Sequence, residues 1–154
     1  DGLLTLAFQV IAESGSIEAI KEISKAIGTC GTIGGQAADM LNKKPETRAQ
    51  KPDIEYINEK KTALLFEVAV KLGGIIKGAS KQEVSALGNF GRDIGLAFQL
   101  LDDLKDKDGY VKLYGACRTK EKAEFLAKRA KSHLDIFGKK AKTLLNLADL
   151  IAAS

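Results

Sequence analysis

The chain has 154 residues, enough for one domain with a core of its own. Hydrophobic residues make up 45% of it and charged residues 29%, which excludes a disordered chain. Its two cysteines, Cys30 and Cys117, lack metal-site spacing, and no apolar run approaches the roughly 20 residues that span a bilayer. We therefore expect a protein without a membrane span, in a reducing, cytoplasmic setting.

The net charge of +4 arises mainly between residues 118 and 142, where basic residues outnumber acidic ones. Such a segment can attract phosphate-bearing ligands, but it more often forms a solvated helix face. Its basic residues are mainly lysines, accompanied by only two aromatic side chains, Phe125 and Phe137. Because nucleic-acid surfaces usually combine arginine with aromatic contacts, we expect no nucleic-acid partner.

The first third of the chain predicts short helices. Apolar spacing indicates helices at 2–13 and 16–30, with Ser16 as the N-cap of the second. A glycine-rich join then leads into a short helix that ends at Leu41. The polar segment 42–52 contains both prolines and predicts a surface loop.

The remainder predicts longer helices. The segment 53–77 returns to helical periodicity, and 81–106 has the clearest apolar seam. Two further helices are expected at about 119–136 and 139–152, each after a short glycine-containing turn. No strand pattern or internal repeat accompanies them, so the predicted fold class is all-α, a helical bundle.

An acidic cluster lies at the end of the helix 81–106. Gln99, Asp102, Asp103 and Asp106 fall within roughly one 100° sector of that helix. Like charges on one face repel, and acidic groups near a helix C-terminus oppose its dipole. The spacing alone is compatible with a solvated helix end or with a site for an oxygen-seeking cation such as Mg²⁺. Its position after a tightly packed apolar helix favours a site at the mouth of the bundle.

Four blocks of sequence carry a family resemblance. GRDIGLAFQLLDDLKD (Gly91–Asp106) is similar to a second aspartate-rich region, and GTIGGQAADM (Gly31–Met40) is similar to a G-G-Q-x-x-D block. KKTALLFEVAVKLGGI (Lys60–Ile75) is similar to a Lys-Thr helix, and DGLLTLAFQ (Asp1–Gln9) is similar to the helix after a first aspartate-rich motif. In this order the blocks resemble the trans-isoprenyl diphosphate synthases, of farnesyl or geranylgeranyl diphosphate synthase type.

The resemblance implies an isoprenoid-synthase bundle truncated at its N-terminus, in which residues 1–154 are the C-terminal part of a single polyprenyl synthase domain. It also implies a prenyltransferase of isoprenoid biosynthesis that condenses isopentenyl diphosphate with an allylic diphosphate. That reaction proceeds by Mg²⁺-dependent ionisation, condensation and elimination, and members of the family are typically homodimers.

The resemblance assigns roles residue by residue. The implied Mg²⁺ ligands are the carboxylates Asp102, Asp103 and Asp106, which together with Lys61 are the implied catalytic residues. The implied substrate-binding residues, which contact the allylic diphosphate or face the cavity near it, are Lys61, Thr62, Gln99, Gln36 and Asp39. Without the family, the favoured interpretation is that Lys61 and Thr62 are helix-surface residues and that Gln36 and Asp39 cap the helix after Gly35.

The sequence departs from the family pattern in one main respect. The first aspartate-rich motif, the arginines that follow it and the residues that bind isopentenyl diphosphate are absent, and the chain opens at Asp1 straight into an apolar helix. We therefore expect a piece of a longer protein, inactive alone, with exposed apolar surface on its first helix. The alternative is a non-catalytic regulatory or partner subunit of a prenyl synthase, against which the intact aspartates argue.

Overall fold

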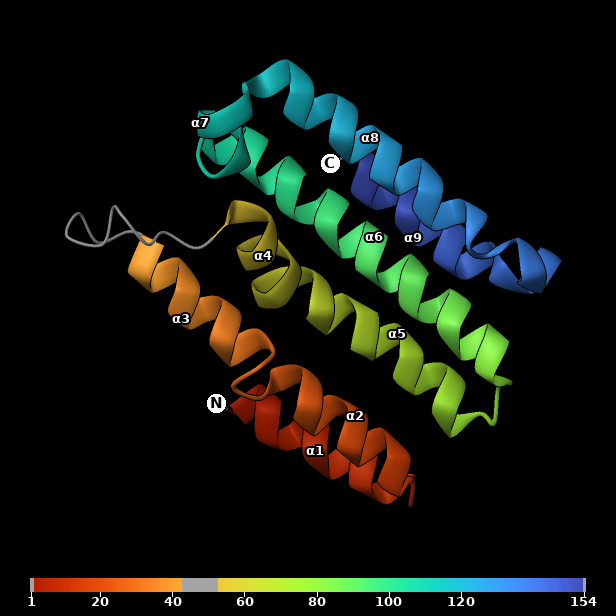
Figure 1. Ribbon diagram of the computed structural model, residues 1–154. Coiled ribbons are helices and arrows are strands. Elements are labelled where there is room, and N and C mark those ends of the chain that lie inside the picture. The colour runs from red at the N-terminus through yellow and green to blue at the C-terminus, as the bar shows by residue number, and fades with distance from the viewer. Residues whose placement is uncertain (1, 43–52, 154) are drawn as a thin grey trace.

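The computed structural model describes residues 2–42 and 53–153, and over these ranges the chain forms helices and turns without a strand (Figure 1). The all-α prediction is confirmed. In chain order the helices are α1 (Gly2–Glu13), α2 (Ile17–Ile27), α3 (Thr32–Asn42), α4 (Ile54–Asn58), η2 (Glu59–Ala63), α5 (Leu64–Ile76), α6 (Lys81–Asp106), α7 (Tyr110–Tyr114), α8 (Ala116–Ser132), η3 (Asp135–Ala141) and α9 (Lys142–Ala152). The segment η2 is a π-helix and η3 is a 3₁₀-helix.

The helix ends differ from the sequence prediction at several points. The second helix ends at Ile27 because Gly28 leaves helical geometry, with φ −65° and ψ −174°. The helix expected at 139–152 begins at Lys142, because Gly138 has a positive φ of 52° that interrupts the preceding turn. Of the loop predicted at 42–52, Asn42 belongs to α3, and positions 43–52 lie outside the described residues.

Side-chain caps fix the starts of several helices, among them α2 and α6. Ser16 is the N-cap of α2 as predicted, and its Oγ accepts a hydrogen bond from the backbone N–H of Ala19 at 3.2 Å. Helix α6 begins with a capping box: Ser80 Oγ accepts from the Glu83 N–H at 3.2 Å, and Glu83 Oε2 accepts from the Ser80 N–H at 2.8 Å. Two otherwise unpaired backbone donors are thereby satisfied at the start of the 26-residue helix.

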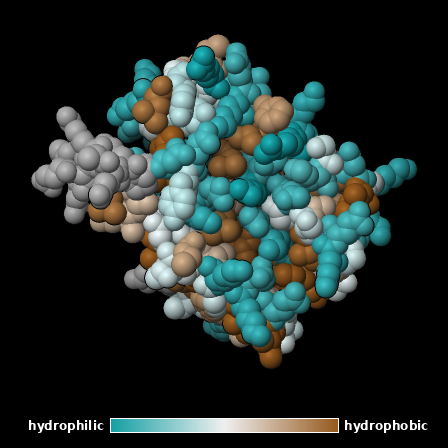
Figure 2. All heavy atoms as spheres, in the orientation of Figure 1, coloured by the Kyte–Doolittle hydropathy of each residue, from teal (hydrophilic) through white to brown (hydrophobic). Residues whose placement is uncertain are grey.

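Hydrophobic side chains remain exposed on the first helix. Leu3 is 84% exposed and Val10 is 57% exposed, as expected from the sequence. Figure 2 shows hydrophobic residues reaching the surface between hydrophilic ones on the face that it presents. Among the helices of residues 2–42 and 53–153, none combines the length and the apolar character needed to cross a bilayer.

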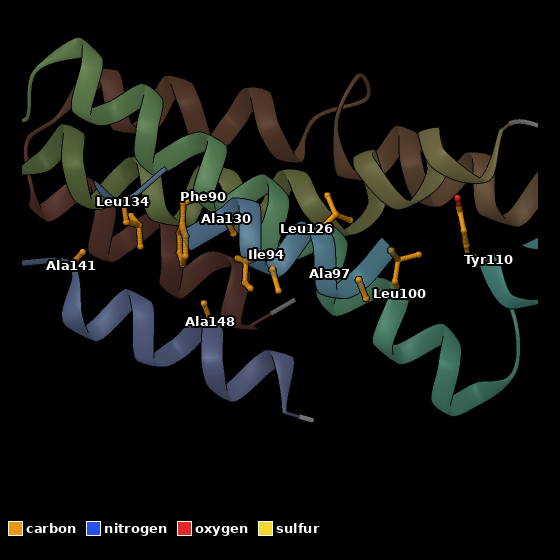
Figure 3. Close-up of a cluster of buried hydrophobic side chains, with 12 residues drawn as sticks. Phe90, Ile94, Ala97, Leu100, Tyr110, Leu126, Ala130, Leu134, Ala141 and Ala148 are labelled. Atoms are coloured by element: carbon orange, nitrogen blue, oxygen red, sulfur yellow. The ribbon is translucent and has the colours of Figure 1, made fainter. Parts of the chain in front are cut away.

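Helix α6 is the centre of the bundle, where it packs against α5 on one side and α8 on the other. Figure 3 shows the side chains of α6, α8 and α9 that fill this core, including Phe90, Ile94 and Leu126. A second cluster, to which Ile11, Ile23 and Leu72 belong, joins α1 and α2 to α5. Burial of these clusters away from water is the main contribution to the stability of the bundle.

Glycines let three backbones approach closely around η2. A Cβ atom added to Gly35 of α3 would lie 2.4 Å from the backbone nitrogen of Lys61. On the other side, a Cβ on Gly95 of α6 would lie 2.9 Å from Cα of Ala63, and one on Gly91 would lie 2.7 Å from the carbonyl oxygen of Phe66. The π-helical segment is therefore held between α3 and α6 by backbone contacts that any larger residue would disrupt.

A buried carboxylate connects α6 to α8. Asp93 is only 4% exposed, and its two oxygens accept hydrogen bonds from Nε and Nη2 of Arg129, both at 2.6 Å. His133 Nε2 lies 3.0 Å from Asp93 Oδ2. The hydrogen bonds to Asp93 raise the pKa of Arg129 above its ordinary value. This bidentate pair fixes the register of the two helices.

Candidate active site

A polar cavity of about 680 Å³ opens at the end of the bundle where α6 ends. Helices α3, α4 and α7 surround it, and Figure 1 shows these three helices at the same end of the molecule. Six of the predicted site residues line it together: Asp39, Lys61, Gln99, Asp102, Asp103 and Asp106. Further polar side chains of the wall, which were not predicted as site residues, are Asn42, Asp53, Asn58, Asp108 and Lys112.

A second cavity, of about 600 Å³ and mostly apolar, adjoins the first. Helix α3 contributes Ile33 and Met40 to its wall, and α5 contributes Leu65 and Phe66. The remaining predicted residues, Gln36 and Thr62, line this cavity and not the polar one. Lys61 lines both cavities and marks their junction.

The π-helical segment η2 positions Lys61 and Thr62. A π-helix carries an extra residue in the turn, and such turns are frequent at functional sites. Lys61 Nζ lies 2.7 Å from Asp39 Oδ2, which joins η2 to α3. Thr62 Oγ1 donates to Gln99 Oε1 at 2.7 Å, which joins η2 to α6. The two neighbouring residues therefore bind side chains from different helices.

Asp103 lies inside the wall of the polar cavity. It is 7% exposed, and both of its carboxylate oxygens accept hydrogen bonds. The Oδ1 atom accepts from Gln99 Nε2 at 2.9 Å, and Oδ2 accepts from the backbone N–H of Tyr110 at 2.8 Å. Burial raises the pKa of Asp103 above its ordinary value, although the hydrogen bonds from Tyr110 and Gln99 oppose this increase.

The turn after α6 is shaped around this carboxylate. A Cβ atom added to Gly109 would lie 2.5 Å from Asp103 Oδ2, and the φ of Gly109 is +53°. Both observations require glycine at this position. The backbone of the turn thus folds directly over the Asp103 side chain and delivers the N–H of Tyr110 to it.

All three aspartates line the polar cavity, but Asp102 and Asp106 are exposed whereas Asp103 is buried. Within residues 2–42 and 53–153, no group of three or more His, Cys, Asp or Glu side chains is arranged to hold a metal ion. The donor chemistry nevertheless fits Mg²⁺, which takes one or two carboxylates together with water and substrate phosphate oxygens. The assignment of Asp102, Asp103 and Asp106 as metal ligands stays a prediction.

Sequence reasoning missed a cluster behind the site. Lys122 Nζ of α8 donates to Glu55 Oε1 of α4 at 2.6 Å and to the Tyr110 hydroxyl at 2.9 Å. The ammonium group also lies 4.6 Å from the centre of the Tyr110 ring. This cluster fixes α7, and with it the Tyr110 N–H that binds Asp103. The lysine carried no sequence signal, because it is one of many in a basic helix.

The fold is that of the isoprenoid-synthase class of all-α proteins. An FPP/GFPP synthase from Zymomonas mobilis, 32% identical, superposes with a TM-score of 0.86 over 98% of this chain and 58% of that one. A putative farnesyl-diphosphate synthase from a Marinomonas species is 30% identical. It superposes with a TM-score of 0.77 over 99% of this chain and 61% of that one.

The sequence comparisons define the family. The polyprenyl synthetase family model matches residues 1–115, and the chain belongs to this family. Geranylgeranyl pyrophosphate synthase 4 of Arabidopsis thaliana is 34% identical over 97% of this chain and 47% of its own length. A chloroplastic geranylgeranyl pyrophosphate synthase of Capsicum annuum is 36% identical over 99% of this chain and 48% of its own length. The chain therefore spans about half the length of these relatives.

Proposed function

We propose that this chain carries the part of a prenyltransferase active site that binds the allylic diphosphate, in an enzyme that condenses this substrate with isopentenyl diphosphate. The observation that carries the proposal is the position of Lys61 at the junction of a polar and an apolar cavity. An allylic diphosphate has the same two-part character, with an anionic head and an apolar tail. Lys61 is placed to bind the head while the tail enters the cavity beside Met40.

In this reaction the C–O bond of the allylic diphosphate breaks and both bonding electrons leave with the diphosphate. The double bond of isopentenyl diphosphate then attacks the allylic cation, and loss of a proton restores a double bond. Lys61 stabilises the negative charge that develops on the leaving diphosphate. The apolar wall around Phe66 keeps water from the cation. Asp102 and Asp106 would hold Mg²⁺, which would supply further neutralisation of charge.

The remaining parts of the proposal concern the assembly. We infer that the chain alone has little or no transferase activity, because the implied isopentenyl diphosphate residues are not among its motifs. We further propose that it acts as part of a longer polypeptide that forms a homodimer. Cytoplasmic location stays a prediction, since the relatives include chloroplastic and mitochondrial forms.

Calorimetry with an allylic thiodiphosphate, in which sulfur replaces the bridging oxygen, tests the substrate assignment. In the presence of Mg²⁺ we expect it to bind more tightly than either inorganic pyrophosphate or the matching prenyl alcohol, because only the intact analogue fills both cavities. Lys61→Met should weaken analogue and pyrophosphate alike. A wild-type chain that binds none of the three compounds would contradict the proposal and favour the non-catalytic partner subunit.

A turnover assay tests the inactivity of the isolated chain. Incubation of the chain alone with both diphosphates and Mg²⁺ should yield no elongated prenyl product. Efficient product formation would overturn this part of the proposal while supporting the substrate assignment.

A further inference from the structure

The side chains of Thr62, Gln99 and Asp103 form one continuous hydrogen-bond chain that ends at the backbone of Tyr110. Its links are Thr62 Oγ1 to Gln99 Oε1 at 2.7 Å, Gln99 Nε2 to Asp103 Oδ1 at 2.9 Å, and the Tyr110 N–H to Asp103 Oδ2 at 2.8 Å. It crosses from η2 through α6 to α7. Contacts with other helices hold each of these elements independently, so both ends of the hydrogen-bond chain are fixed in position.

The chemistry of the end groups decides the orientation of the Gln99 amide. A carboxylate only accepts hydrogen bonds, so Asp103 requires the NH₂ group of Gln99 on its side. The amide oxygen must then face Thr62, whose hydroxyl is the donor in that pair. A reversed amide would place its oxygen against the carboxylate and its NH₂ group against Thr62. Asp103 therefore selects one of the two orientations.

This orientation divides the polar groups at the cavity into donors and orienting groups. The hydrogen of the Thr62 hydroxyl is committed to Gln99, so Thr62 offers an anion only lone pairs. Gln99 Nε2 has two hydrogens, of which Asp103 takes one, and the half-buried side chain lines the polar cavity. The second N–H is therefore the donor available to a diphosphate oxygen.

We propose that Asp103 is a positioning residue, which acts through Gln99, and not a metal ligand. In this assignment Asp102 and Asp106 serve the metal, while Asp103 and Thr62 together hold the Gln99 amide so that it donates to the diphosphate. The inference rests on the proposed function for its ligand, but the hydrogen-bond chain itself exists in the ligand-free protein. Lys122 and Glu55 support it from behind by fixing α7 through the Tyr110 hydroxyl.

Substitution of Asp103 by asparagine tests the carboxylate in particular. Asp103 faces two N–H donors, from Gln99 and from Tyr110, and an amide of the same shape can accept from only one of them. In the metal-free, ¹⁵N-labelled chain, Asp103→Asn should therefore shift the side-chain amide resonances of Gln99 or the backbone amide of Tyr110. Asp102→Asn, which removes the neighbouring charge, should leave the Gln99 side-chain and Tyr110 backbone amide resonances unshifted.

Ligand binding separates a positioning residue from a metal ligand. Asp103→Asn should change Mn²⁺ affinity, measured by paramagnetic broadening, by less than about twofold, whereas Asp102→Asn should lower it clearly. At saturating Mg²⁺, Asp103→Asn should weaken pyrophosphate binding about tenfold, which corresponds to the loss of a charge-assisted hydrogen bond. An equal loss of Mn²⁺ affinity in the two variants would overturn the proposal.

Thr62 provides a second test that does not depend on the stability of the α7 turn. Thr62→Val keeps the shape but removes the hydroxyl, and should shift the Gln99 amide and weaken pyrophosphate binding as Asp103→Asn does. Thr62→Ser, which keeps the hydroxyl, should show the wild-type Gln99 resonances and the wild-type affinity for pyrophosphate. Wild-type Gln99 resonances in Thr62→Val would contradict the inference. If the wild-type chain binds no pyrophosphate, the proposed function fails, yet the resonances of the metal-free variants still decide whether the hydrogen-bond chain exists.

Discussion

Lys61 and Asp39 form an ion pair at the junction of the two cavities, with 2.7 Å between Nζ and Oδ2. The Lys61 side chain is 37% exposed and that of Asp39 is 12% exposed. The Lys61 ammonium group that a diphosphate would meet is thus already paired with a carboxylate. An entering anion must share this lysine with Asp39.

We predict that Asp39→Asn raises the affinity for inorganic pyrophosphate in the absence of metal. The expected gain is about threefold, because a partly exposed ion pair is worth up to about 1 kcal/mol. Asp149→Asn is the matched control, since it also removes one negative charge and releases a lysine, Lys131, but on α9 and α8. Calorimetric titration measures both variants, and an equal gain would show that only net charge matters.

The close approach of α3 to η2 predicts the effect of adding a single methyl group. Gly35→Ala would force the two backbones apart and should destabilise the fold by about 1–3 kcal/mol while separating Lys61 from Asp39. Gly73→Ala is the control, because nothing lies within 4 Å of an added Cβ there, and it should stabilise α5 by about 0.4–1 kcal/mol. Urea unfolding compares the two, and similar effects would contradict the packing argument.

Two arginines offer a matched comparison of buried and exposed partners. The side chains of Arg129 and Arg92 are both 46% exposed, but the partner carboxylate Asp93 is 5% exposed and Glu59 is 37% exposed. Arg129→Met should cost about 2–3 kcal/mol of unfolding free energy, because a buried carboxylate loses two hydrogen bonds. Arg92→Met should cost less than about 1 kcal/mol. Equal costs in denaturant titrations would show that burial of the partner is unimportant.

The capping box of α6 predicts a pH dependence of stability. Hydrogen bonds from the Ser80 hydroxyl and the Ser80 N–H lower the pKa of Glu83 below its ordinary value of 4.5. A group whose pKa is depressed on folding stabilises the protein above the unfolded pKa, and this contribution disappears as the pH falls through the folded pKa. The stability difference between wild type and Ser80→Ala should therefore shrink below pH 4.5. A difference that stays constant down to low pH would contradict this role.

The long helices were predictable from apolar periodicity, whereas the gathering of site residues from different helices at one end was implied by the family resemblance. Helix α7 was not predictable, since Tyr110–Tyr114 is too short to show a period. The predicted helix 53–77 was correct in extent, but η2 within it was missed. A π-turn depends on tertiary contacts, in this case the glycine contacts from α3 and α6.

The three aspartates show more clearly what the sequence alone could not predict. Adjacent helical positions differ by about 100°, so Asp102 and Asp103 cannot share one environment equally. Which of them turns inward depends on Gly109 and Tyr110, which follow the helix and fold back over its end. The spacing of the carboxylates therefore predicted an acidic site. The different roles of the individual carboxylates could be inferred only from the structure of the turn after α6.

The backbone contacts of Gly35, Gly91 and Gly95 have a mechanical consequence for the two cavities. Main-chain contacts cannot yield by rotamer changes, so the η2 backbone that carries Lys61 is held stiffly beside the cavities. The apolar cavity is lined by side chains, among them the flexible thioether of Met40, and can deform more readily. The backbone that carries Lys61 thus keeps its position, while the apolar side chains beside it can adapt to an apolar chain.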